Sequence, residues 1–525
     1  MKHFDHIIVG AGSAGCVLAN RLSADPARQV LLIEAGPRDS NPFIHMPAGL
    51  AMLVGNRKLN WNYSTEPEPG LNGRRLWWPR GRVLGGSSSI NAMCYVRGQR
   101  EDYDGWVAAG ADGWSWDEVL PYFRRAEDQS RGEDLWHGVG GPLSVSDLRH
   151  RSTLSQVFLD AARAAGQPLN PDFNGASQLG AGWYQVTQRD GRRASSATAY
   201  LRPVRARPNL SVMTATLATR LRLAHGRVTG VEVTSRHGLQ QIQAPELTLA
   251  GGAVNSPQLL LLSGIGPAAD LEALGIDVVL DLPGVGANLH DHLDYCVLSK
   301  CTQPVTYDFN KLQQAWVGLR YLYGRNGPGS SNIAEAGAFL CTPLARGGRP
   351  DVQLHFVPAQ LDDHGRNRLP GHGYTVHVCG LQPKSRGRLS LASADPRAAP
   401  RIHGNYLAES ADAATLLAGV RLVRQILASG PFDRYRGAEV FPGPEANSPA
   451  ALLEALRAKA ESVYHPVGSC RMGRDMDAVV DPRLRVHGLE GLSVADASVM
   501  PVIPSGNTNA PTVMIAERAA EFLGG

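Results

Sequence analysis

Two short segments near the carboxyl end of this 525-residue chain carry side chains that could move a proton. The first contains His465, which Tyr464 and Pro466 place in a turn rather than on a helix face, and the second contains Asn507 and Asn509. A neutral imidazole can act as a base near pH 7, and a carboxamide can donate a hydrogen bond without competing for the proton. Taken alone, a structural histidine and turn-forming asparagines are the commoner interpretation of such residues.

The amino end carries a pattern typical of dinucleotide binding. An apolar strand leads into Gly-Ala-Gly-Ser-Ala-Gly at 10–15, and a second apolar strand ends on Glu34. In such a unit Gly10 permits a tight turn, Gly12 lets the backbone approach a pyrophosphate, and Gly15 allows close packing of helix on strand. The acid can then bind a ribose hydroxyl. With 58 glycines in the chain, roughly one such glycine pattern is expected by chance, so its place between a strand and a helix carries the prediction.

Further segments suit the same nucleotide domain. Residues 80–91 form a loop rich in glycine and serine, whose N–H groups and hydroxyls suit a large polar ligand, although a plain surface loop is equally consistent. Strands are predicted at 210–213, 228–233 and 247–250, and the last of these meets a glycine pair before a helix that includes 257–262.

Residues 300–460 follow a different pattern. Helical periodicity appears at 415–427 and 450–461, and alternating strands appear at 352–357 and 374–378. This combination predicts an antiparallel sheet covered by helices, which would form a separate substrate-binding domain.

The composition excludes several classes of protein. The net charge is +4 and the arginines are scattered without a basic block, which argues against nucleic-acid binding. Seven widely spaced cysteines contain no Cys-x-x-Cys pair, so we expect reduced thiols and neither a disulfide framework nor a metal site. The chain has no apolar run of about 20 residues, and the first strand begins by Asp5 without room for a signal peptide, so a cytoplasmic protein is expected.

One apolar segment at 42–54 could still meet a surface. We expect a lid or a segment at a domain interface. The alternative is peripheral contact with the inner face of the cytoplasmic membrane, or with a lipid-soluble electron acceptor.

In combination these motifs resemble the glucose-methanol-choline (GMC) flavin oxidoreductases. The motifs that carry the resemblance occur in the family's order along the full chain: the amino-terminal nucleotide unit, RGRVLGGSSSIN, GAVNSPQLLLLSGIG, HPVGSCRMG and NTNAPT. The stretches LLIEAGPRDSNPFIHMPAGLA, LNWNYSTEPEP and LQPKSRGRLSL are similar to the bacterial flavin alcohol dehydrogenases of alkane degradation and to choline dehydrogenase.

The resemblance implies an α/β, Rossmann-like FAD-binding domain made of residues 1–150, 193–300 and 463–525. Residues 151–192 and 301–462 would form a discontinuous α+β substrate-binding domain built on an antiparallel sheet.

The family binds FAD, and its contact residues match positions of this chain. The implied contacts are Gly10, Gly12, Ser13, Ala14 and Gly15 at the pyrophosphate, Glu34 at the ribose, Ser87, Asn91, Ala92, Met93 and Cys94 near the flavin, Ala218 at the adenine, Asp496 and Ala497 along the ribityl and phosphate chain, and Thr512 in a helix that points toward the flavin. Ile90 stands where some members carry the histidine that binds FAD covalently, so non-covalent FAD is expected.

For activity, the resemblance implies His465 as the catalytic base and Asn509 as its partner. The leading hypothesis is oxidation of primary alcohols to aldehydes, with electrons passed to a quinone or similar acceptor. An oxygen-using oxidase, a choline dehydrogenase with Glu335 facing the ammonium, and a non-redox lyase remain as alternatives.

Overall fold

The computed structural model describes residues 3–53, 55–367 and 369–524. Val54, the last residue of the predicted 42–54 segment, lies outside the described residues, as do the two end residues of the predicted nucleotide domain.

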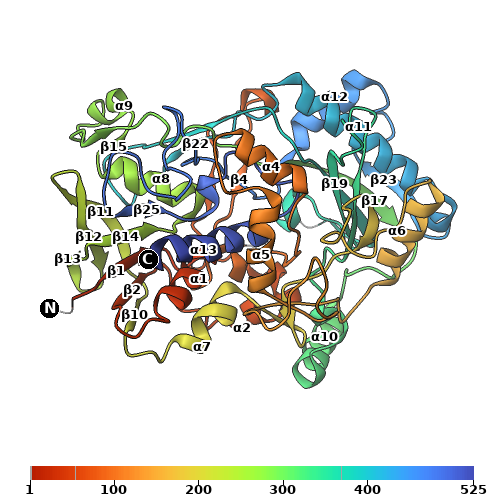
Figure 1. Ribbon diagram of the computed structural model, residues 1–525. Coiled ribbons are helices and arrows are strands. Elements are labelled where there is room, and N and C mark those ends of the chain that lie inside the picture. The colour runs from red at the N-terminus through yellow and green to blue at the C-terminus, as the bar shows by residue number, and fades with distance from the viewer. Residues whose placement is uncertain (1–2, 54, 368, 525) are drawn as a thin grey trace.

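A five-stranded parallel sheet forms the nucleotide-binding half, in the strand order β10-β2-β1-β14-β25 (Figure 1). Its strands are β1 (His6–Val9), β2 (Val30–Ile33), β10 (Leu210–Met213), β14 (Glu246–Leu249) and β25 (Leu492–Val494). The central strands are continuous apolar runs, as expected where both faces of a parallel sheet are covered. The predicted strands at 210–213 and 247–250 are confirmed within this sheet.

Two helices from opposite ends of the chain pack together beside this sheet. These are α1 (Ser13–Leu22) and α13 (Asn509–Gly524). Arg21 of α1 donates two hydrogen bonds, of 2.8 and 2.7 Å, to the fully buried carboxylate of Glu517 in α13. The carboxyl end of the chain therefore completes the unit that the first 34 residues begin.

A small antiparallel sheet adjoins the parallel one, with the order β11-β12-β13. The strands are β11 (Leu217–Ala224), β12 (Arg227–Ser235) and β13 (Gly238–Gln243). His225 and Gly226, with φ of 50° and 74°, form the two-residue turn between the first pair, which suits the right-handed twist of the strands.

The second half is built on a seven-stranded antiparallel sheet, ordered β23-β17-β20-β19-β18-β7 with β24 beside β17. The strands are β7 (Gly180–Trp183), β17 (Leu293–Cys301), β18 (Ala336–Leu340), β19 (Val352–Val357), β20 (Gly373–Gly380), β23 (Arg436–Phe441) and β24 (Glu461–Ser462). Helices α6 (Thr153–Ala164) and α11 (Ser410–Leu427) contact the sheet, and α12 (Pro449–Lys459) packs against α11 and β17. The predicted strands and helices of this region are confirmed, but β17 places residues 293–300 in this sheet rather than with the nucleotide-binding half.

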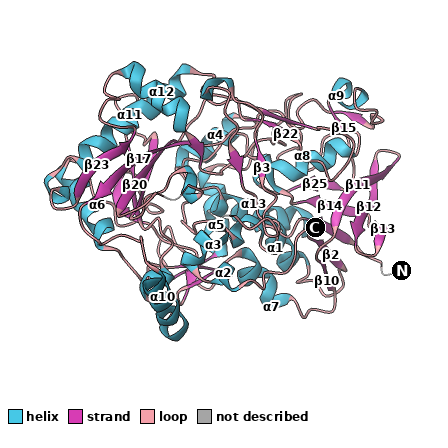
Figure 2. Ribbon diagram, turned by 180° about the vertical axis from the view of Figure 1, so that it is seen from behind, coloured by secondary structure: helices cyan, strands magenta, loops and turns pink. Residues whose placement is uncertain are grey.

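Five further elements contact one another, and three of them, α2, α3 and α10, can be seen in the lower half of Figure 2. They are α2 (Pro42–His45), η1 (Pro47–Gly49), α3 (Leu50–Leu53), α10 (Lys311–Gly324) and η5 (Gly327–Ser330). The hydroxyl of Tyr321 in α10 donates to the carbonyl oxygen of His45, 3.2 Å away, and this bond ties α10 to the 42–54 segment.

The remaining elements connect and cover these sheets. They are α4 (Arg100–Ala108), α5 (Trp116–Ala126), α7 (Arg202–Val204), α8 (Gly252–Leu262), α9 (Ala268–Glu272), β3 (Tyr63–Ser64), β4 (Trp77–Trp78), β5 (Glu127–Gln129), β6 (Leu143–Val145), β8 (Gln188–Arg189), β9 (Arg192–Arg193), β15 (Ile265–Gly266), β16 (Leu280–Asp281), β21 (Arg388–Ser390), β22 (Arg401–His403), η2 (Pro69–Leu71), η3 (Gly86–Ser89), η4 (Ala197–Leu201), η6 (Asp363–Gly365), η7 (Gly430–Phe432) and η8 (Ala497–Val499). Within the described part of the chain, no helix combines the length and the apolar character needed to cross a membrane.

Candidate active site

A single cavity of about 700 Å³ joins the two halves of the molecule. One end is lined by the glycine turn after β1, by Glu34 and by Ala218, and the other end is lined by His465, Asn507 and residues of the antiparallel sheet. The predicted nucleotide contacts and the predicted base therefore border one continuous space.

The three glycines of the turn differ in how much room each has for a side chain. A Cβ on Gly15 would lie 1.8 Å from the carbonyl oxygen of Gly10, and a Cβ on Gly10 would lie 2.5 Å from that of Ala250. Gly12 is different, because a Cβ there would meet no atom closer than 3.8 Å. Packing therefore requires Gly10 and Gly15, whereas Gly12, which lines the cavity, leaves its backbone open to a ligand.

The start of α1 suits an anion. Gly12 occupies the N-cap position, and among the described residues no side chain caps it. The first N–H groups of a helix are unpaired within the helix and lie at its positive end, so the turn at Ser13 and Ala14, which line the cavity, is suited to an anion. This arrangement fits the pyrophosphate of a dinucleotide.

Glu34 lies at the end of β2, almost fully buried at the edge of the cavity. Its carboxylate accepts hydrogen bonds from the N–H groups of Ala11 (3.0 Å) and Gly36 (2.7 Å), which fix its direction. Burial raises the pKa of Glu34 to about 7, and the two N–H groups oppose that rise. A carboxyl group held in this way is placed to bind a ribose hydroxyl.

The 80–91 loop crosses close to the glycine turn, since a Cβ on Gly86 would lie 2.7 Å from the Cα of Gly12. Ser87 and Asn91 line the cavity, but the chain also uses both side chains. The Ser87 hydroxyl accepts from the N–H of Gly81 (3.1 Å), and the Asn91 carbonyl accepts from Arg193 (2.7 Å).

Other predicted cofactor contacts also line the cavity, namely Ala92, Met93, Cys94, Ala218, Ala497 and Thr512. Burial raises the pKa of the Cys94 thiol to about 12, so it stays protonated. Asp496 lines the cavity as well, but its carboxylate caps neighbouring segments by accepting from the N–H of Gly252 (2.8 Å) and of Ser498 (2.8 Å).

His465 follows a left-handed residue, Tyr464, whose φ is 69°. Two contacts hold this turn: the N–H of His465 donates to a carboxylate oxygen of Asp291 (2.7 Å), and Arg80 donates to the carbonyl oxygen of Tyr464. Asp291 also accepts from the hydroxyl of Tyr406 (2.6 Å). The imidazole is thus positioned by backbone anchors on both sides.

A chain of hydrogen bonds fixes which nitrogen of His465 is basic. The Nε2 of His292 lies 3.2 Å from the carbonyl oxygen of Leu381, so it carries the proton, and the Nδ1 of a neutral His292 must accept. That Nδ1 is 3.1 Å from the Nδ1 of His465, which therefore carries the proton of the second ring. The Nε2 of His465 is left as an acceptor, 3.2 Å from the Nδ2 of Asn507.

The electrostatic setting keeps this imidazole neutral. Burial lowers the pKa of His465 well below its usual value, and His292, His355 and Arg80 lower it further. A neutral imidazole whose Nε2 faces the cavity is the form that a general base requires.

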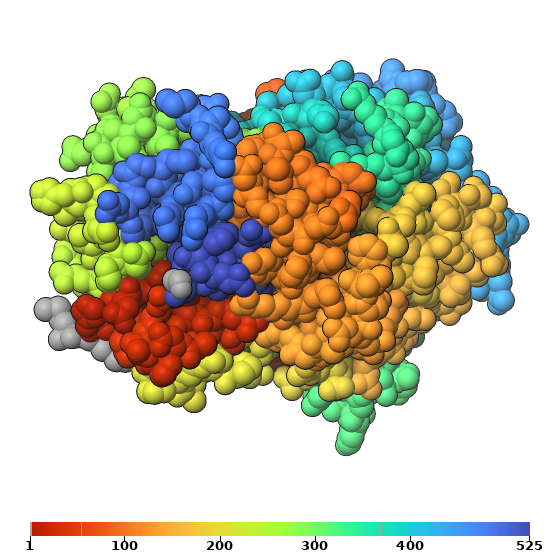
Figure 3. Space-filling model, in the orientation of Figure 1, coloured from red at the N-terminus to blue at the C-terminus, as the bar shows by residue number. Residues whose placement is uncertain are grey.

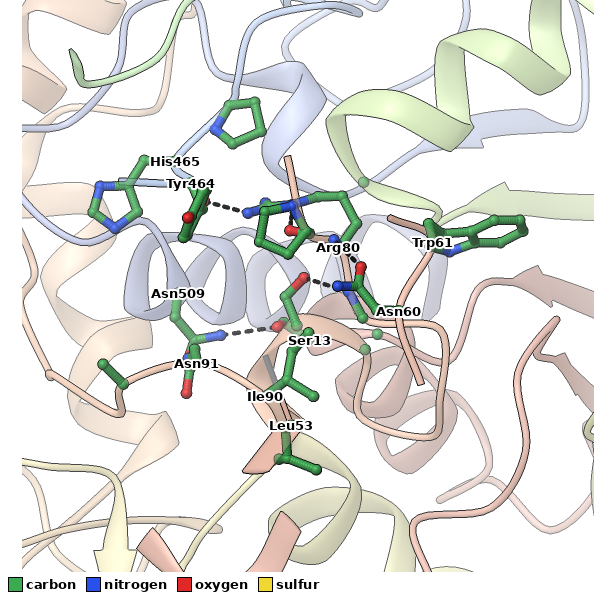
Figure 4. Close-up of a pocket in the computed structure, with 18 of the residues that line it drawn as sticks. Ser13, Leu53, Asn60, Trp61, Arg80, Ile90, Asn91, Tyr464, His465 and Asn509 are labelled. Atoms are coloured by element: carbon green, nitrogen blue, oxygen red, sulfur yellow. Dashed lines mark hydrogen bonds between the residues drawn. The ribbon is translucent and has the colours of Figure 1, made fainter. Parts of the chain in front are cut away.

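The expected contact between Asn509 and His465 is not present. The amide of Asn509 donates to the hydroxyl of Ser13 (2.8 Å), at the start of α1, and Figure 4 shows it pointing away from the imidazole. Asn507 takes that place, and its carbonyl oxygen accepts from Gln353 (3.0 Å), which fixes the amide with its NH2 group toward His465. Asn509 is the first residue of α13, whereas Asn507 precedes that helix, and both side chains line the cavity. The catalytic role of Asn509 stays a prediction.

Sequence reasoning missed Asp291, His292, His355 and Gln353. The sequence did hold a signal for the first two, because His-Asp-His at 290–292 places three titratable residues side by side. Nothing in the neighbouring sequence showed that they would contact residue 465. His355 and Gln353 alternate with apolar residues in β19, and the alternation could not show which face borders a cavity.

One further cluster lies behind the cavity wall. His377, which lines the cavity, has its Nδ1 2.6 Å from Asp294 and 3.3 Å from the sulfur of Cys296. Their ligand atoms lie within 4.8 Å of one another, close enough to hold a metal ion. The sequence predicted no metal site, and that absence stays a prediction.

Comparisons with known proteins agree over the whole chain. Residues 4–294 and 383–516 match the two domain profiles described as GMC oxidoreductase. An alcohol dehydrogenase [acceptor] of Pseudomonas putida is 48% identical over 99% of this chain and 95% of its own length. A mitochondrial choline dehydrogenase of Mus musculus is 47% identical over 99% of this chain and 89% of its own length.

Among solved structures, one from a study of FAD modification in a formate oxidase of Aspergillus oryzae superposes with a TM-score of 0.93 at 28% identity. The alignment covers 99% of this chain and 98% of that one. These findings confirm the predicted fold class and support FAD as the dinucleotide of the glycine turn. The chain therefore belongs to the GMC oxidoreductases and is an enzyme of that family.

Proposed function

We propose that this enzyme oxidises primary alcohols to aldehydes with non-covalently bound FAD and passes the electrons to a quinone or similar acceptor. When bound, FAD supplies the hydride acceptor at its flavin N5. The residues proposed to hold it border the cavity: Gly10, Gly12, Ser13 and Ala14 of the glycine turn, Glu34, Ala218, and Ser87, Asn91, Ala92, Met93 and Cys94 of the 80–94 segment. Gly15 does not line the cavity, and it packs against Gly10.

The observation that carries the proposal is the oriented pair of His465 and Asn507. His465 presents an unprotonated Nε2 to the cavity, so it can take the hydroxyl proton of an alcohol. The NH2 group of Asn507 lies beside that nitrogen and can donate to the alcohol oxygen as negative charge develops on it. Asp291 and Arg80 hold the turn that carries His465, so the base needs little rearrangement.

The decisive experiment is anaerobic flavin reduction by a primary alcohol in the His465→Ala variant. FAD should remain bound, because His465 is not among the proposed phosphate or ribose contacts, while reduction should slow by about 10²-fold or more. Unchanged reduction kinetics would remove His465 as the base. Full bleaching of the wild-type flavin by the alcohol would also speak for redox chemistry and against the lyase alternative.

Non-covalent attachment rests on Ile90, which lines the cavity where some relatives carry a histidine. An isoleucine side chain has no nucleophilic atom, so we expect acid precipitation to release all of the yellow colour into the supernatant. Colour that stays with the precipitated polypeptide would contradict this expectation.

Choline is the second candidate substrate, supported by the relative in Mus musculus and by Trp77 and Tyr464, whose rings meet edge to face at the cavity. A cationic ammonium also needs a carboxylate. Glu335, the candidate for that role, is fully buried and does not line the cavity. Its carboxylate accepts hydrogen bonds from the hydroxyl of Ser155 and from the N–H of Ser152 (2.7 Å). Glu335 is therefore not placed to meet a bound ammonium, and although Asp308 lines the cavity, we favour uncharged alcohols.

A substrate panel would separate these alternatives. Aliphatic, aromatic and amino alcohols should be assayed with a dye acceptor and separately with oxygen. Rapid oxygen consumption during turnover would favour the oxidase alternative. A strong preference for choline over a neutral alcohol of similar size would favour a choline dehydrogenase.

A further inference from the structure

Helix α10 projects from the body of the protein (Figures 1 and 3). Several of its large apolar side chains are exposed to solvent. Leu312, Trp316, Leu319 and Tyr323 are 83%, 56%, 54% and 88% exposed. Their spacing of three to four residues places them on one side of the helix, and we call them the α10 apolar stripe. Leu322, 78% exposed, widens it at the carboxyl end of the helix.

The opposite face of α10 explains how the helix is held without this stripe. Val317 and Tyr321 are buried, and the Tyr321 hydroxyl bonds to the backbone of the 42–54 segment. The helix is thus docked on the protein through its inner side, and the fold makes no use of the outer one. Exposed apolar side chains gathered in this way mark an interaction surface more often than a plain surface.

The charged residues within the α10 segment itself are all basic. From residue 309 to residue 334 the sequence contains no Asp or Glu, although the protein as a whole has 48 acids to 52 Lys and Arg. The same segment contains Lys311, Arg320 and Arg325, all exposed. A positively charged border next to exposed Leu, Trp and Tyr side chains complements an anionic lipid surface.

The start of α10, on the side of the helix away from the stripe, borders the active-site cavity. Tyr307, Phe309 and Gln314, at the start of α10 and just before it, line the cavity, as do Leu50 and Leu53 of α3. Leu53 lies in Figure 4 at the side of the site away from His465. Met52 of α3 is 62% exposed and adds a further apolar side chain next to these lining residues.

We infer that the α10 apolar stripe, with Met52, docks this enzyme on the surface of an anionic lipid bilayer. The helix projects from the body of the protein, and a soft bilayer can accept a projecting apolar helix without a matching surface shape. Trp and Tyr beside Leu suit the boundary between headgroups and acyl chains. With 14 residues the helix is about 21 Å long, too short to span a bilayer but long enough to lie in its surface.

Such docking would bring the α10 end of the cavity close to the lipid surface. Combined with the proposed function, on which this step rests, it would let a lipid-soluble alcohol or electron acceptor reach the site without crossing water.

The test is co-sedimentation of the FAD-loaded enzyme with lipid vesicles, without turnover. We expect binding to phosphatidylcholine vesicles that contain phosphatidylglycerol, with weaker binding in high salt or on pure phosphatidylcholine. The triple variant Leu312→Ser, Trp316→Ser, Tyr323→Ser should bind at least about 10-fold less. The matched control is Leu135→Ser, Leu239→Ser, Met476→Ser, which removes three equally exposed apolar side chains from other surfaces and should bind like the wild type.

Two results would overturn the inference. One is equal vesicle binding by the wild type and the α10 variant. The other is a wild-type dimer that the α10 variant converts to a monomer, because the stripe would then be covered by a second copy of the chain.

Both variants should keep wild-type turnover of a water-soluble alcohol with a soluble dye, since none of the six residues lines the cavity. Because vesicle binding is measured without substrate, its result tests the docking inference independently of the proposed alcohol oxidation.

Discussion

At the scale of single residues, the site depends on which nitrogen of one imidazole is free. The hydrogen bonds from Leu381 through His292 to His465 leave the Nε2 of His465 as the acceptor that faces Asn507. No property of the residue types alone fixes that state. It follows from the positions of three groups that lie far apart in the sequence.

The pH dependence of the reaction should reflect the setting of His465. Burial disfavours the imidazolium, so the pKa of His465 lies below its usual value of 6.5 and the neutral base persists as the pH falls through 6. We expect the acid limb of kcat/KM for a neutral primary alcohol to have its midpoint below 6.5. A midpoint above 6.5 that is lost in the His465→Ala variant would contradict the described environment.

Replacing each of the two asparagines by alanine should affect a different property of the enzyme. Asn507→Ala removes the donor beside the Nε2 of His465, so flavin reduction should slow by about 10- to 10³-fold with FAD still bound. Asn509→Ala removes the bond to Ser13 at the start of α1, so its main effect should be weaker FAD retention. Stopped-flow reduction and FAD titration measure the two effects. The reverse pattern would restore the pairing predicted from the sequence.

At the scale of elements, the start of α1 combines two kinds of glycine. A Cβ on Gly15 would overlap the backbone of Gly10, whereas a Cβ on Gly12 would meet no atom closer than 3.8 Å. Both occupy the same sequence motif, and only the three-dimensional neighbours distinguish a structural glycine from one that admits a ligand.

This difference predicts two distinct outcomes on substitution. Gly12→Ala should leave the melting temperature of the apoprotein unchanged but weaken FAD binding about 10-fold or more, because the methyl group occupies the approach to the backbone. Gly15→Ala should destabilise the apoprotein by about 1–3 kcal/mol or more, because its Cβ would overlap a carbonyl oxygen. Differential scanning calorimetry and FAD titration distinguish them. Equal loss of stability in both variants would show that Gly12 is also a packing residue.

Elements with strong local patterns were predictable. The glycine turn, the strand before Glu34, and the strands at 352–357 and 374–378 lie where hydrophobic periodicity placed them. The division between the two halves was harder, because β17 pairs across the predicted boundary at residue 300 with strands some 80 to 140 residues later. Strand pairing at that separation leaves no local mark in the sequence.

At the scale of the whole molecule, the sequence predicted which segments form the candidate site but not how their side chains contact one another. His465, Glu34 and the 80–94 segment border one cavity, as the resemblance implied. The role of Asn509 stays a prediction, because both asparagines line the cavity. The sequence could not show that the amide of Asn507, two residues earlier, would lie beside the imidazole.

The order of the parallel sheet has a consequence for how this protein is made. Its strand β25 comes from residues 492–494, and α13, which packs on α1, comes later still. A growing chain on the ribosome therefore exposes the glycine turn long before the last strand and its covering helix exist. The cradle for FAD can close only after β25 and α13 have been synthesised, so capture of the cofactor has to follow both elements.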